Sequence, residues 1–88
     1  MRRITMNNGD TYDAEWCGES QNILVIAISG LSVKDVADRF SNVAATSSIT
    51  VHGSETETTY SGYTDLVSVN SGVWGEGTVT LSLRKAGG

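Results

Sequence analysis

Short runs in which apolar and polar residues alternate, separated by turns rich in glycine and asparagine, make up most of this chain. A period of two residues is typical of strands that bury one face. We expect such strands at residues 3–7, 11–17, 48–52, 55–60, 63–70 and 78–84. The segment 23–29 is apolar on both faces, which predicts a central strand covered on both sides. In the segment 63–70, Val67 and Val69 are expected to share a face.

One segment has helical periodicity instead. Its apolar positions recur at a spacing that would form a buried stripe. They are Val33, Val36, Ala37 and Phe40. Ser32 precedes them as a possible N-cap, with Asp35 at the third helical position in the manner of a capping box. We expect the helix to end within residues 42–45, with Asn42 as its cap.

These elements predict an α+β fold with the order β-β-β-α-β-β-β. In this count the run from 55 to 70 is interrupted at Gly62 by a bulge or a bend. Because short connections favour antiparallel neighbours, we expect about six mainly antiparallel strands. They would form a curved sheet or a small half-open barrel with one helix packed against it. A chain of 88 residues is expected to form a single domain over 1–88, with a flexible tail at 85–88.

The alternation also assigns faces to the first two strands. In the second strand it places Trp16 on the buried face with Ala14, and Cys17 on the opposite face. A two-residue hairpin loop would pair Ile4 with Asp13, whereas a three-residue loop would pair Ile4 with Ala14. A slip of one residue exchanges the two faces, so the hydrophobic pattern favours the three-residue loop.

Charge and cysteine content exclude several classes of function. All ten acidic residues lie between Asp10 and Glu76 with only two cations among them, and the overall formal charge is −4. Nucleic-acid binding needs clustered cations and is therefore not expected. Cys17 is the single cysteine, so neither an internal disulfide nor a four-ligand zinc site can be drawn from it and His52. The longest apolar run, 23–28, is too short for a membrane span.

Catalytic constellations are weak. Cys17 and His52 are a conceivable nucleophile and base, although a strand-end cysteine and a surface histidine explain them equally simply. Asp13 with Glu15, and Glu55 with Glu57, share strand faces, which is what solvated faces look like. The glycine-rich segment 72–77 lacks the residues of a phosphate loop. We therefore expect no enzyme, metal, cofactor or small-molecule substrate, and a cytoplasmic location in the cell.

Aromatic residues are the best candidates for contact with a partner. Trp74 lies in the glycine-rich segment, where it would either cover the core or anchor an interface. Tyr60 and Tyr63 flank a bend, so that one could pack inward while the other meets a partner. The expected partner is another protein or a second copy of the chain.

Four segments carry a resemblance to a known group of proteins. They are 4–9 (ITMNNG), 12–18 (YDAEWCG), 45–49 (ATSSI) and 60–66 (YSGYTDL). In these features the chain resembles small, mostly uncharacterised prophage proteins of Firmicutes, over residues 3–84. The resemblance implies a phage origin and a place in the tail or baseplate module, and it assigns no catalytic or binding residue.

Three functions follow as hypotheses. The first is a structural or assembly protein of a phage, incorporated in the virion. The second is a small acidic anti-defence inhibitor of a host protein, which requires the acidic residues to gather on one face. The third is a small enzyme or metal-binding domain, which requires a pocket with converging polar groups around His52 or Cys17.

Overall fold

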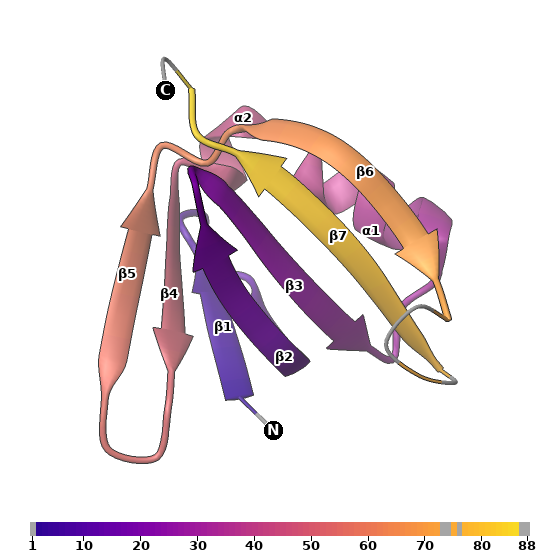
Figure 1. Cartoon of the computed structure of the whole chain (residues 1–88), viewed down its shortest axis with the longest axis horizontal. Coiled ribbons are helices and arrows are strands. Elements are labelled where there is room, and N and C mark those ends of the chain that lie inside the picture. Colours follow the sequence, from indigo (N-terminus) through magenta and orange to yellow (C-terminus); the bar gives the residue numbers. More distant parts are fainter. Residues whose placement is uncertain (1, 73–74, 76, 87–88) are drawn as a thin grey trace.

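The computed structural model of the chain describes residues 2–72, 75 and 77–86. Within these residues it contains seven strands and two helices. They are β1 (Arg2–Met6), β2 (Thr11–Ser20), β3 (Ile23–Ser29), α1 (Val33–Phe40), α2 (Val43–Thr46), β4 (Ser48–His52), β5 (Glu57–Ser61), β6 (Asp65–Ser71) and β7 (Thr78–Arg84). The expected α+β fold is confirmed: the sheet is antiparallel, curved and open, and the main helix packs against it (Figure 1).

The strands lie in the order β5-β4-β1-β2-β3-β7-β6. Consecutive strands β5 and β6 therefore occupy opposite edges of the sheet (Figure 1). Gly62 is not a bulge within one strand, as the count of about six strands assumed. It has φ +84°, and it donates to the Ser47 carbonyl at 3.1 Å and accepts from Ala86 N–H at 2.8 Å. This junction sends the chain from one edge of the sheet to the other.

Strand β2 belongs to two parts of the sheet. Its residues 11–14 pair with β1, whereas Ala14 and residues 16–20 pair with β3, and the register with β3 shifts between Ala14 and Trp16. Glu15 is thus the extra residue of a β-bulge, which bends a strand and increases its twist. We call β5, β4, β1 and residues 11–14 the first half-sheet. Residues 16–20 with β3, β7 and β6 form the second half-sheet.

The bulge reverses the alternation that the sequence predicted for β2. Cys17, expected on the outer face, points into the core and is 8% exposed. Trp16, expected inside, lies on the outer face and is 39% exposed. Its indole covers Gly18, where an added Cβ would stand 2.6 Å from a ring carbon. Both face assignments were therefore wrong, because one extra residue inverts every later position in the strand.

The core lies between the two half-sheets and is completed by the helices and the β5–β6 link. Its residues are Ile4, Met6, Ala14, Cys17, Leu24, Ile26, Ile28, Val36, Phe40, Ala45, Ile49, Val51, Tyr63, Val79, Leu81 and Leu83. Helix α1 contributes the fully buried Val36 and Phe40, whose ring centroid lies 5.5 Å from that of Tyr12. The buried stripe of the helix is thereby confirmed for these two residues, while Val33 is 38% exposed.

The helix caps follow the sequence at one end only. The Ser32 side chain accepts a hydrogen bond from Asp35 N–H at 3.2 Å, as predicted for the N-cap. At the other end α1 stops at Phe40, earlier than expected. Asn42 does not close α1 but begins α2, where its side chain accepts from Ala44 N–H at 3.1 Å.

The first hairpin has a loop of the predicted length in a different register. Met6 N–H donates to the Asp10 carbonyl at 2.7 Å, leaving three residues, 7–9, in the loop. Ile4 consequently pairs with Tyr12 and not with Ala14. A shift of two residues preserves the faces of a strand, so the apolar side of β1 remains the core side.

Two further expectations change in the second half of the chain. The register of β6 shifts between Leu66 and Ser68, which turns Val67 outward to 52% exposure and separates it from the half-buried Val69. At the end of the chain, Lys85 N–H donates to the Asn22 carbonyl at 2.9 Å and Ala86 is bonded to Gly62. The first two residues of the expected tail are therefore tied to the fold, and 87–88 lie outside the described residues.

Candidate functional site

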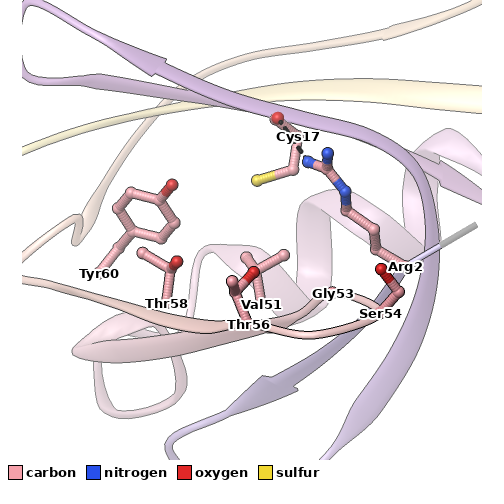
Figure 2. Close-up of a pocket in the computed structure, with 8 residues that line it drawn as sticks. All are labelled: Arg2, Cys17, Val51, Gly53, Ser54, Thr56, Thr58 and Tyr60. Carbon is pink, nitrogen blue, oxygen red and sulfur yellow. Dashed lines mark hydrogen bonds between the residues drawn. The ribbon is translucent and has the colours of Figure 1, made fainter.

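A cavity of about 470 Å³ opens between the two half-sheets, and we call it the cleft (Figure 2). Its lining residues are Arg2, Cys17, Val51, Gly53, Ser54, Thr56, Thr58 and Tyr60. Cys17 comes from the second half-sheet and the remainder from the first, including the β4–β5 turn. The cleft combines hydroxyl groups, one thiol, one cation and a few apolar surfaces.

Arg2 is the cation of the cleft. It pairs with Ala14 in the ladder, so its side chain leaves β1 on the same face as the buried Ile4 and Met6. The guanidinium donates a hydrogen bond to the Cys17 carbonyl at 3.3 Å (Figure 2). Arg2 thereby links the end of β1 to the part of β2 that continues beyond it.

The Cys17 thiol points into the cleft but lacks the features of a nucleophile. Burial raises its pKa, with Arg2 as a smaller opposing effect, so the thiol is protonated at neutral pH. His52 cannot serve it as a base, because Val51 lies on the core side of β4 and the next residue, His52, on the outer side. The conceivable Cys17–His52 pair is therefore not formed.

Of the three aromatic candidates, the structure brings two together. The rings of Tyr60 and Tyr63 meet edge to face with centroids 6.0 Å apart. Tyr63 is only 2% exposed and donates a hydrogen bond to the Glu19 carboxylate. It is a core residue, not an exposed anchor, while Tyr60 lines the cleft. Trp74 lies outside the described residues.

The pKa values of Tyr60 and Tyr63 both lie above the ordinary value of tyrosine. The hydrogen bond to Glu19, then burial, raise the pKa of Tyr63 to about 12. Burial first, followed by the neighbouring Cys17 and Glu19, also raises the pKa of Tyr60. Both phenols are therefore neutral at physiological pH and act as hydrogen-bonding and packing groups.

His52 belongs to a polar row on the outer face of the first half-sheet. Thr5 Oγ1 lies 3.0 Å from His52 Nε2, and His52 Nδ1 lies 3.3 Å from a Glu57 carboxylate oxygen. Across four strands the row runs Asp13, Arg3, His52 and Glu57. Neighbouring positions of opposite charge stabilise such a ladder. The row places Arg3 beside Asp13 and His52 beside Glu57, so each of these acids has a basic neighbour on the next strand.

Another hollow lies on the outer face of the second half-sheet, and we call it the groove. It has a volume of about 390 Å³ and is mostly apolar. Its lining residues are Trp16, Gly18, Glu19, Ser20, Ile23 and Val25. The groove was not predicted from the sequence, because the alternation of apolar and polar residues in β2 does not show the bulge that turns Trp16 outward. The one available signal is Gly18, since a strand glycine beside an aromatic residue provides room for a ring to lie over it.

The cations at the two ends of the chain do not gather. Arg2 and Arg3 lie on β1, which β2 and β3 separate from β7. Arg84 on β7 binds Asp65 at 2.5 Å. The described helices include none long and apolar enough to cross a membrane.

Comparison with known proteins gives no relative: no family model, curated protein or solved structure matches the chain. Its function is therefore inferred from its own residues.

Proposed function

We propose that this chain is a non-enzymatic assembly subunit that acts through protein–protein contacts. From the resemblance to prophage proteins, we further propose that it acts in the cytoplasm of a host cell and becomes part of the tail or baseplate of a virion. The single observation that carries the proposal is the groove, where the half-exposed Trp16 stands beside Ile23 and Val25 on an outer face of the sheet.

Hot spots of protein–protein binding are enriched in tryptophan, and here an exposed tryptophan lies beside aliphatic residues. Such anchors cost at least about 2 kcal/mol of binding free energy when truncated, and they cluster in desolvated hollows. Apolar hollows on an outer surface mark contact sites for other proteins. A small domain also gains stability from partners that bind only its folded state, because its own core is thin.

The inhibitor hypothesis has less support from the arrangement of charge. It requires a continuous acidic face, whereas three acids of the sheet lie beside basic residues. Asp13 is opposite Arg3, Glu57 contacts His52, and Asp65 binds Arg84.

If the protein were a hydrolase, the contacting side chains of Thr5, His52 and Glu57 would be its candidate catalytic residues. A hollow of about 690 Å³ on the outer face of the first half-sheet is lined in part by Thr5 and His52, but the side chains of His52 and Glu57 are 38% and 65% exposed there. Hydroxyl–imidazole–carboxylate catalysis draws its strength from preorganised groups in a site that excludes water. The exposed row fits a stabilising ladder better than a catalytic site.

Size-exclusion chromatography with light scattering, over a range of concentrations, tests the proposal. It is run on the chain alone and after co-expression with the products of neighbouring genes. We expect either a discrete oligomer or a stable complex, lost in Trp16→Ala and retained in Val67→Ala, which truncates an exposed apolar residue on β6. A chain that stays monomeric and forms no complex with these products would overturn the proposal.

A further inference from the structure

We propose that residues 16–20 of β2 are a docking edge for an extended peptide segment of a partner protein. The segment adds to β2 as an antiparallel strand, with an apolar side chain in the groove and a carboxylate in the cleft. This inference rests on the proposed function and specifies the chemistry of the partner.

The direction of the backbone groups establishes the edge. Gln21 and Asn22 have φ of +53° and +66°, as in a two-residue hairpin turn closed by the pair Ser20–Ile23. The closing pair exchanges hydrogen bonds, and hydrogen-bonded pairs then alternate along the ladder. Ser20, Gly18 and Trp16 therefore direct their N–H and C=O groups toward β3. Residues 17 and 19 direct theirs away from it.

The bond from Arg2 supports this assignment independently. The Arg2 guanidinium reaches the Cys17 carbonyl at 3.3 Å, which requires that carbonyl to face away from β3. Strand β1 pairs with β2 only from Thr11 to Ala14. Beyond Ala14, β2 has no neighbouring strand on this side within the described residues. The Arg2 side chain takes the place of such a strand as a hydrogen-bonding partner of the backbone.

The groove and the cleft lie on opposite sides of the edge formed by residues 16–20. The groove lies on its outer side and contains Trp16 and Gly18, while the cleft lies on its inner side and contains Cys17. Side chains of an added strand alternate between the two sides. Strand addition to an exposed edge obtains affinity from backbone hydrogen bonds and specificity from pockets for alternate side chains. The arrangement of edge, groove and cleft meets both requirements.

The residues of the edge specify the sequence that would fit. A peptide residue opposite Gly18 points to the outer side, beside the Trp16 indole and Val25, so it should be apolar. The residue opposite Cys17 points into the cleft, where an aspartate can pair with the Arg2 guanidinium. The residue opposite the exposed Glu19 should be basic, because the carboxylate attracts a cation.

A synthetic probe follows from these rules. The fluorescein-labelled peptide Ser-Lys-Leu-Asp-Val-Ser, blocked at its C-terminus, places Lys opposite Glu19, Leu opposite Gly18 and Asp opposite Cys17 in antiparallel register. Binding is measured by fluorescence anisotropy with the full chain. We expect saturable binding that weakens at least about tenfold when Lys and Asp are exchanged.

Backbone methylation separates strand addition from other modes of binding. The Asp N–H of the peptide points toward β2, so N-methylation there should weaken binding at least about tenfold. The Leu N–H points away, so N-methylation there should change the affinity less than about threefold. Equal effects of the two methyl groups, or no binding of the parent peptide, would overturn the docking edge.

Variants of the chain complete the test. Trp16→Ala and Arg2→Gln should each lower the affinity for the parent peptide several-fold, while Val67→Ala should leave that affinity unchanged. If the chain forms a dimer that must dissociate before the peptide can bind, the edge is occupied by a second copy of the chain. That result would overturn its assignment to a partner protein. Assembly without peptide binding would leave the proposed function standing and refute only the docking edge.

Discussion

Replacing Phe40 by alanine tests whether α1 is held by the sheet. The Phe40 ring is fully buried and packs on Tyr12 at 5.5 Å, so the substitution leaves a cavity between α1 and the sheet. Phe→Ala changes in cores cost about 3–5 kcal/mol. At roughly 0.05–0.15 kcal/mol per residue, 88 residues give a free energy of unfolding of about 4–13 kcal/mol. Phe40→Ala should therefore remove about a quarter or more of the stability.

Urea unfolding followed by far-ultraviolet circular dichroism measures this loss. With a denaturant dependence of about 2 kcal/mol per M, the midpoint should fall by roughly 2 M. Val33→Ala is the matched control, because Val33 lies on the same helix at 38% exposure and should cost less than about 1 kcal/mol. A Phe40→Ala loss no greater than that of the control would refute the packing of α1 against the sheet.

Three further outcomes follow from single contacts. Absorbance at 295 nm should show Tyr63 ionising near its pKa of about 12, and Glu19→Gln should lower that value; ionisation of all tyrosines near pH 10 would contradict the contact. Because the folded pKa lies above the ordinary value of 10, the stabilisation from this phenol is complete below pH 10 and is lost as the pH rises toward 12. Ser32→Ala should cost about 1 kcal/mol in urea unfolding through loss of the N-cap, and an unchanged midpoint would refute the cap. Asn22→Gly should stabilise the chain by roughly 0.5–1 kcal/mol, since glycine adopts a positive φ without strain; a lower midpoint would exclude the left-handed turn.

Local pattern was enough to predict several elements. The bounds of β4 and β7 coincide with the predicted 48–52 and 78–84, because their alternation is unbroken and flanked by clear turns. The Ser32 cap likewise follows from side-chain chemistry within four residues. These features depend on neighbours in sequence, which a single chain displays directly.

Features set by distant contacts could not be read in the same way. The bulge at Glu15 reverses Trp16 and Cys17, and nothing in the alternation of β2 shows where an extra residue is accommodated. Gly62 looked like an interruption of one strand, because the choice of opposite sheet edges depends on which strands pair at long range.

The candidate site was only partly foreseen for the same reason. Tyr60 lines the cleft, but Tyr63 is buried against Glu19, a partner 44 residues away in sequence. Trp16 was overlooked as a surface residue because its outward direction depends on the bulge. The second tryptophan, Trp74, remains a prediction.

Amide hydrogen exchange of the free chain, resolved by residue with NMR, tests most directly whether β2 carries an open edge beyond Ala14. The amides of Gly18 and Ser20 should exchange slowly, because they are bonded to β3, while those of Cys17 and Glu19 should exchange rapidly and become protected when the peptide is added. Protection of Cys17 and Glu19 equal to that of Gly18 in the free chain would show that the edge is already closed, and would contradict the proposed docking site.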